Sequence, residues 1–109
     1  MLEYKGYVGH AEYDSESHVF HGEVLDTRDV ITFQSDTVKG LERAFRESID
    51  DYLHFCAERG DTPDKPFSGR LMVRLPPELH RRAFVQAREQ GKSLNQWIAE
   101  NLEDQLTRR

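Results

Sequence analysis

The chain has 109 residues, of which 37% are hydrophobic and 32% are charged, and its formal net charge is −5. This length fits one ordinary domain or two very small ones, and a piece of about 40 residues would need a partner to complete a core. No apolar run approaches the roughly 18 residues that a transmembrane helix requires, so no membrane span is expected.

The cysteine content and the first residues bear on the compartment. Cys56 is the single cysteine, so it cannot form a disulfide within the chain. Residues 1–5 lack the apolar centre of a signal peptide. We therefore expect a cytoplasmic protein whose thiol is reduced and packed.

Charge is divided unevenly along the chain. Residues 1–66 hold 7 Lys and Arg against 15 Asp and Glu, whereas residues 67–109 hold 8 against 5. Two parts of opposite sign indicate two different partners, a basic one for the first part and phosphate for the second.

The first 35 residues predict an antiparallel meander of three strands. Residues 4–13 are rich in aromatic side chains and partly alternate, and residues 19–25 form the expected return strand after a turn at 14–17. A second turn at 26–29 leads to a β-branched strand at 30–34. Glycines within these segments are interpreted as strand glycines that allow close packing, namely Gly6, Gly9 and Gly22.

After residue 35 the apolar residues recur every three or four positions, which predicts a helix of about 20 residues. Asp36 or Thr37 is suited to cap its start and Gly60 to end it. A helix laid on a three-stranded sheet is a small α+β layer. The apolar stripe that predicts the helix consists of Val38, Leu41, Phe45, Ile49, Tyr52 and Cys56, with Ala44 and Phe55 alongside.

A polar segment with two prolines, residues 61–66, predicts a boundary between domains. We predict an N-terminal domain over residues 1–62, a linker over 63–68 and a C-terminal domain over 69–109. The sequence contains no internal repeat.

The C-terminal part predicts a short strand and two helices. Leu71, Val73 and Leu75 alternate with Arg70, Met72 and Arg74, which gives one aliphatic face and one polar or long-chained face. Pro77 suits the first turn of a helix that Gly91 ends. Ser93 and Gln96 then have the spacing of a capping box at the start of a second amphipathic helix.

A strand of about six residues followed by two helices has no partner nearby in the sequence. It could join the N-terminal sheet as a fourth strand, with its arginines in water. The order of strand, proline-started helix, glycine and capped helix favours pairing with the same strand of a second chain, which gives a ribbon that fits the major groove of DNA.

In that arrangement two groups of residues are expected to contact DNA. Arg70, Met72 and Arg74 face outward from the ribbon, where arginine reads guanine edges and methionine can touch a thymine methyl but offers no hydrogen-bond donor. The start of the last helix offers free backbone amides for phosphate. The residues of that second group are Lys92, Ser93, Leu94 and Asn95.

Two family resemblances cover nearly the whole chain. Residues 69–107 resemble a ribbon-helix-helix domain of the Arc/MetJ/CopG type, and residues 1–66 resemble the N-terminal domain of HicB antitoxins. The residues that carry these resemblances are Tyr4-Lys5-Gly6-Tyr7, Phe20-His21-Gly22-Glu23-Val24, Asp29-Val30-Ile31-Thr32-Phe33, Pro66-Phe67-Ser68-Gly69-Arg70, Leu75-Pro76-Pro77-Glu78-Leu79-His80 and Ser93-Leu94-Asn95-Gln96-Trp97.

The HicB resemblance implies a type II antitoxin. Such a protein blocks HicA, a small basic mRNA-cleaving toxin, and represses its own operon as a homodimer or a tetramer on operator DNA. It also implies a partial ribonuclease H-like fold for the N-terminal domain. It assigns no toxin-contacting residues. The alternative is a free-standing regulator whose N-terminal domain senses a small molecule or a metal.

Neither an enzyme site nor a cofactor is expected. The carboxylates that could form a ribonuclease H-like magnesium site lie mostly at predicted turns, where Asp is common for local reasons: Glu12, Asp14, Glu23, Asp26 and Asp29. If Tyr13 pairs with His18, His10 falls opposite His21, and two cross-strand imidazoles could hold a metal. A zinc site needs further ligands, however, and Glu12 and Glu23 are expected on the other face, so we interpret both imidazoles as ordinary strand histidines.

Overall fold

The computed structural model describes residues 1–108 and divides the chain into two compact units, residues 1–70 and residues 71–109. Residues 61–70 therefore belong with the N-terminal unit. Arg109, the last residue of the predicted C-terminal domain, lies outside the described residues.

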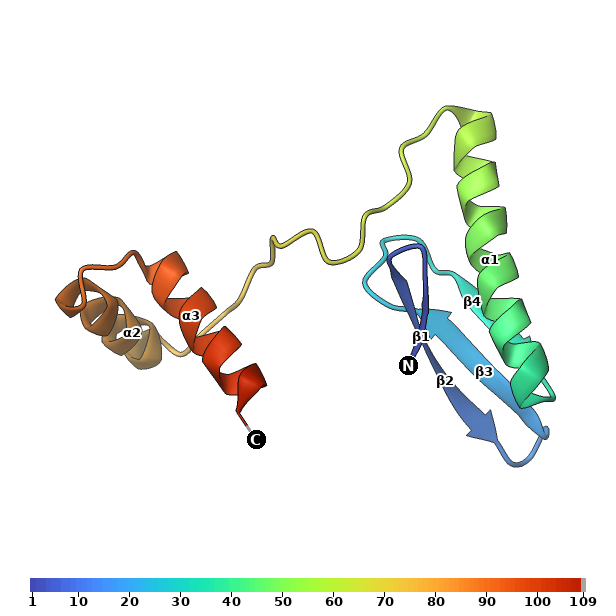
Figure 1. Ribbon diagram of the computed structural model, residues 1–109, viewed down its shortest axis with the longest axis horizontal. Helices are drawn as coiled ribbons and strands as arrows, with labels where there is room; N and C mark the ends of the chain where they lie inside the picture. Colours follow the sequence, from blue (N-terminus) through green and yellow to red (C-terminus); the bar gives the residue numbers. More distant parts are fainter. Residues whose placement is uncertain (109) are drawn as a thin grey trace. The chain divides into compact units, whose positions relative to one another are not determined.

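The N-terminal unit contains a four-stranded antiparallel sheet in the order β1-β2-β3-β4 (Figure 1). Each strand pairs with its neighbours in sequence, so the predicted meander is confirmed. The prediction of three strands is wrong, because the segment 4–13 is interrupted by a hairpin turn. The strands are β1 (Leu2–Tyr4), β2 (Tyr7–Asp14), β3 (Val19–Val24) and β4 (Thr32–Ser35).

The extra hairpin turns at Lys5 and Gly6, which have φ angles of 50° and 82°. Two successive positive φ values are typical of the tight turn that matches the twist of a two-residue hairpin. Tyr4 consequently pairs with Tyr7. Gly6 is therefore a turn glycine and not the strand glycine that we predicted.

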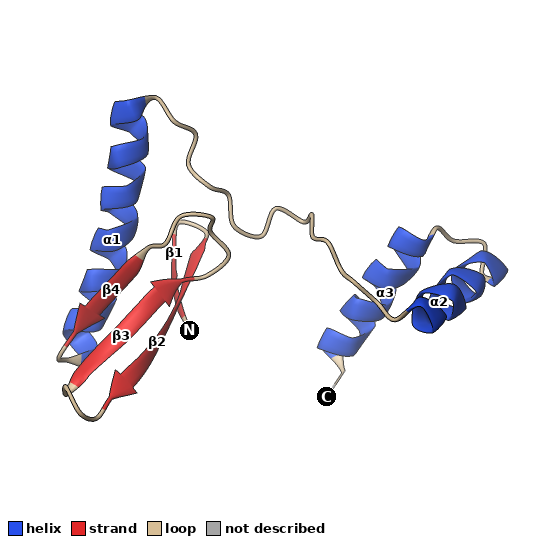
Figure 2. Cartoon of the chain, turned by 180° about the vertical axis from the view of Figure 1, so that it is seen from behind, coloured by secondary structure: helices blue, strands red, loops and turns tan. Residues whose placement is uncertain are grey.

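The helix α1 (Val38–Arg59) covers one face of this sheet, as Figures 1 and 2 show. The Thr37 hydroxyl accepts a hydrogen bond from the Gly40 amide at 3.0 Å, and Gly60 ends the helix in the left-handed region at φ 71°. Both predicted caps are thus confirmed. Phe45 and Ile49 are the most deeply buried side chains of the helix, whereas Val38 and Phe55, which belonged to the predicted apolar stripe, are exposed.

Two strand glycines bring the sheet close to the aromatic core. A Cβ atom added at Gly9 would lie 2.6 Å from Phe45 Cε1, and one added at Gly22 would lie 2.4 Å from Phe33 Cε2. The rings of Phe33 and Phe45 pack against each other with centroids 5.2 Å apart. The prediction that Gly9 and Gly22 permit close packing is confirmed.

The second unit contains the helices α2 (Pro77–Glu89) and α3 (Leu94–Thr107). Pro77 begins α2 as predicted, and the chain leaves it through Gly91 at φ 70°. The Ser93 hydroxyl caps α3 by accepting from the Gln96 amide at 3.0 Å. The Gln96 side chain donates to Glu100 instead of returning to Ser93, so only half of the predicted capping box forms.

Residues 70–76 have no regular secondary structure. The four strands of the sheet all come from residues 2–35, so the alternative in which this segment joins the sheet is wrong. Its pairing with a second chain stays a prediction. Within residues 1–108, no helix combines the length and the apolar character that a membrane crossing needs.

Candidate nucleic-acid and partner-binding surfaces

The segment before α2 exposes both its apolar and its basic side chains. Leu71 and Val73 are 77% and 59% exposed, and Met72 is 97% exposed. Arg70 and Arg74 are exposed too, and neither forms an ion pair with a described residue. An apolar segment this open is poorly stabilised by its own chain, because burial of each such side chain is worth roughly 1.5–3 kcal/mol.

The hairpin of α2 and α3 has almost no core of its own. Ala83 and Ala87 are its only buried hydrophobic residues among those described. Two alanines contribute little apolar area, so the unit as a single copy lacks the core that a domain of about 40 residues requires. The large apolar side chains that remain exposed on the two helices are Leu79, Phe84, Val85, Ile98, Leu102 and Leu106.

The start of α3 is built as predicted, but its lysine is engaged. Ser93 uses its hydroxyl for the cap, and the amides of Leu94 and Asn95 lie in the first turn of the helix. Lys92 forms an ion pair with Glu100, and this lysine lowers the pKa of the Glu100 carboxyl below its ordinary value. Lys92 would have to leave Glu100 to reach a phosphate.

A different surface lies on the face of the sheet opposite α1, where the register differs from the one we considered. His10 pairs with Glu23 and Glu12 pairs with His21, so the two histidines are not opposite each other. The loop between the strands spans residues 15–18, and His18 adopts a positive φ of 58°. We assumed a turn at residues 14–17 with Tyr13 opposite His18. The loop lies one residue later, so Tyr13 pairs with Phe20, two residues further along β3.

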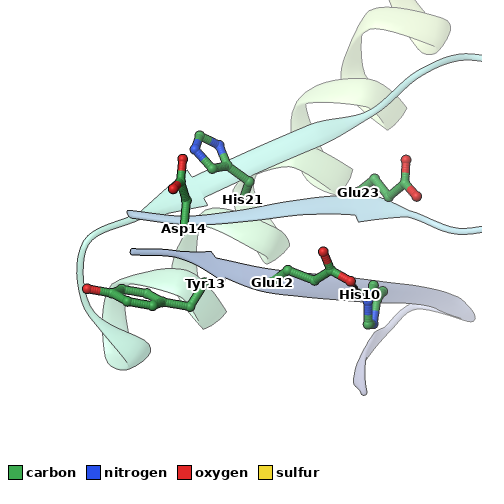
Figure 3. Close-up of a pocket in the computed structure, with 6 residues that line it drawn as sticks. All are labelled: His10, Glu12, Tyr13, Asp14, His21 and Glu23. Carbon is green, nitrogen blue, oxygen red and sulfur yellow. Dashed lines mark hydrogen bonds and ion pairs between the residues drawn. The ribbon is translucent and has the colours of Figure 1, made fainter. Parts of the chain in front are cut away.

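The placement of the carboxylates also needs correction. Residues two apart along a strand share a face, so Glu12 lies on the face of His10 and Glu23 on that of His21. The statement that both glutamates point to the other face is therefore wrong. Figure 3 shows these side chains around a shallow depression of about 500 Å³, lined by His10, Glu12, Tyr13, Asp14, His21 and Glu23.

These groups do not gather closely enough to ligate a cation. Among residues 1–108, no set of three or more His, Cys, Asp or Glu residues has the geometry of a metal site. Asp14 is used by its own turn, where it accepts from the Glu16 amide at 2.9 Å and the Ser17 hydroxyl at 3.0 Å. These bonds lower the pKa of Asp14. Asp26 accepts from the Phe67 amide at 2.9 Å.

Sequence reasoning missed the role of Asp64, a residue of the presumed linker. Its side chain is only 7% exposed and accepts a hydrogen bond from Arg28 Nε at 2.7 Å. This bond connects the linker to the loop between β3 and β4. The Arg28 side chain is the main cause of a lowered pKa at Asp64. The Arg28 and Asp29 amides add further bonds. The one signal in the sequence was an acid between two prolines.

Two tyrosines complete this attachment through the backbone of Asp64. The Tyr7 hydroxyl donates to the Asp64 carbonyl at 2.7 Å, and the Tyr52 hydroxyl accepts from the Asp64 amide at 2.9 Å. Burial raises the pKa of Tyr52 to about 12 and also raises that of Tyr7. The first residues of the linker are therefore attached to the N-terminal unit by hydrogen bonds at Asp64.

These features define a small α+β protein with an acidic sheet domain and a helical hairpin that lacks its own core. A family model described as the HicB family matches residues 52–102, just under half of the chain. This match supports a HicB-type protein and, in general, the antitoxin role and toxin partner that the family name implies. The N-terminal residues that carried the resemblance lie mostly before the matched range. No curated protein and no solved structure matched the chain.

Proposed function

We propose that this chain is the antitoxin of a type II toxin–antitoxin system, which neutralises a HicA-like mRNA-cleaving toxin and represses its own operon. The observation that carries the proposal is the open segment 71–75 in front of a helical hairpin with only two buried alanines. Such a unit is completed by a second copy of itself. The HicB family match over the same part of the chain supports this reading.

The proposed dimer pairs residues 70–75 of two chains as an antiparallel ribbon. Leu71, Val73 and Leu75 then face the helices of both copies, which supplies the core that each lacks alone. Arg70, Met72 and Arg74 are doubled on the opposite face, and a two-stranded ribbon of this size fits the major groove of DNA. The result is a ribbon-helix-helix repressor.

The same proposal assigns toxin binding to the N-terminal unit and assigns no catalysis to the chain. The sign of its charge supports this division, because an acidic domain repels nucleic acid and attracts a basic protein. Asp14 accepts hydrogen bonds within its own turn and Asp26 accepts one from the Phe67 amide, which supports their interpretation as structural carboxylates.

Co-purification tests the proposal directly. The chain is expressed with the product of the adjacent gene, and the purified material is titrated against the DNA upstream of the pair. We expect a stable complex with a small basic protein, and operator binding at about 10 nM or tighter. A chain that binds the upstream DNA but no adjacent product would favour a free-standing regulator, and a chain that binds neither would overturn the proposal.

A further inference from the structure

One face of the N-terminal sheet is uncovered. The helix α1 packs on the face that carries Tyr7, Val24 and Phe33, and no other element of residues 1–70 lies on the opposite face (Figure 2). That opposite face, here called the open sheet face, is built from β2, β3 and β4. Its central side chains are His10, Glu12, His21, Glu23, Thr32 and Gln34.

Charge on the open sheet face is of one sign. Residues 6–27 contain five carboxylates and no Lys or Arg, so no permanent positive charge lies on the β2–β3 hairpin. The histidines alternate with the acids across the strands, as Figure 3 shows. Among the described residues Glu12 forms an ion pair with His10 alone, at 3.4 Å, and Glu23 forms none.

Basic residues elsewhere in this unit are paired with nearby acids. Lys5 pairs with Asp50, Arg46 with Glu42 and Arg59 with Asp61. Arg28 pairs with Asp64. Four of the basic residues in residues 1–66 are therefore matched by nearby acids elsewhere on the unit, whereas the acids of the hairpin are left without a cation. Five of the eight net negative charges of residues 1–66 therefore come from the β2–β3 hairpin and its adjoining loops.

This face is also rigid before any partner arrives. Gly9 and Gly22 sit directly on the rings of Phe45 and Phe33, so the central strands cannot shift without disturbing the core. Carboxylates on paired strands stay at a fixed spacing, and a partner does not have to order them on binding. Preorganisation of this kind reduces the entropy cost of association.

We propose that the open sheet face is the docking surface for a basic protein, and that this protein is the toxin; the inference rests on the proposed antitoxin function. A toxin that cleaves RNA needs a cationic surface to hold the phosphate backbone. The carboxylates of the open sheet face meet that cationic surface in place of phosphates. Docking there blocks the toxin by occupying the surface that RNA requires.

Charge excludes two other occupants of the same face. Nucleic acid is repelled by a surface with acids and no Lys or Arg. A second copy of the same sheet would bring like charges into contact, which opposes association. A basic protein is the occupant whose charge complements the face.

The test is a pair of charge reversals in the full-length chain. The variant E12K/E23K reverses two acids of the open sheet face, and the control E47K/D51K makes the same net change on the exposed side of α1. The probe is the small basic product of the adjacent gene, and binding is measured by titration calorimetry. We expect E12K/E23K to weaken the complex by about 100-fold and the control to change it by less than about threefold.

Two further measurements separate the outcomes. The milder variant E12Q/E23Q keeps the shape of the face and should weaken the complex by about tenfold, and thermal melting establishes that each variant is folded. If the wild-type chain binds the toxin and E12K/E23K binds it equally well, or if the control variant loses as much affinity as E12K/E23K, the docking surface alone is overturned. A wild-type chain that binds operator DNA but no toxin overturns the antitoxin function and the docking surface together.

Discussion

Asp64 accepts hydrogen bonds from Arg28 through both carboxylate oxygens: the Arg28 amide lies 2.8 Å from Oδ2, and Nε lies 2.7 Å from Oδ1. The aspartate is buried while the arginine side chain is 86% exposed. The solvent-exposed Arg28 guanidinium thus forms an ion pair with the buried Asp64 carboxylate, from which most water is excluded. This pair anchors the segment after α1 to the loop between β3 and β4.

The Asp64→Asn variant should lose stability in a pH-dependent manner. The pKa of Asp64 lies below its ordinary value, so its ionised form stabilises the fold. That stabilisation is present above the unfolded pKa of about 3.9 and is lost as the pH falls through the lower folded value. Urea unfolding should show a deficit for the variant at pH 7 that shrinks below about pH 4. The control is Asp61→Asn, at an exposed acid that pairs with Arg59. A deficit that is equal at pH 7 and pH 3 would contradict the assignment.

Val73→Asp tests whether the open segment is a dimer interface. Val73 is 59% exposed in the single chain, so the substitution costs little there, but the proposed ribbon buries two such side chains. An unpaired buried carboxylate costs several kcal/mol, so the dimer dissociation constant should rise by at least about 100-fold. Analytical ultracentrifugation measures this directly.

Met72→Asp is the matched control for that experiment. Met72 is the neighbouring residue, is 97% exposed and faces outward from the proposed ribbon. The control should remain dimeric and should lose operator affinity by charge repulsion with DNA. If both variants stay dimeric, or if both become monomers, the ribbon does not have the two faces that we propose.

The sequence predicted the helices better than the sheet, for physical reasons. Thr37, Gly60 and Ser93 act within one turn of their own helices, so their roles are local and readable. Lys5 has no intrinsic preference for a positive φ, and the hairpin at Lys5–Gly6 depends on the pairing of the strands that it joins. The loop that joins β2 and β3 likewise contains His18 in a left-handed conformation, which the residue type does not predict.

Contacts between distant residues were the least predictable part of the candidate surfaces. Asp64 and Arg28 are 36 residues apart, and neither composition nor spacing points to their pairing. The alternation of a strand places residues 10 and 12 on one side, so our prediction that Glu12 faces away from His10 was an error that the sequence alone could have corrected. The ribbon stays a prediction from the sequence, because a single chain contains no partner strand for residues 70–75.

Arg70→Ala and Arg74→Ala should separate the two proposed activities. Each substitution removes an arginine that can bond the O6 and N7 atoms of guanine, so each should cost about 1–3 kcal/mol in operator binding. Toxin binding should survive both, since it is assigned to the N-terminal unit. Fluorescence anisotropy on operator DNA and calorimetry with the toxin measure the two activities, and Arg43→Ala on α1 is a control of equal charge. Equal loss of both activities would show that the division of labour is wrong.

The ion pair between Lys92 and Glu100 makes a further prediction about the phosphate anchor. If Lys92 binds DNA, Glu100 competes with the phosphate for it, so Glu100→Gln should strengthen operator binding by about threefold to tenfold. Lys92→Ala should weaken binding and should reduce the slope of log affinity against log salt by about 1. Asp104→Asn removes an equal charge from the other end of α3, where Asp104 pairs with Arg108, and should have a smaller effect. Unchanged binding and an unchanged salt slope in Lys92→Ala would mean that Lys92 serves only to hold Glu100.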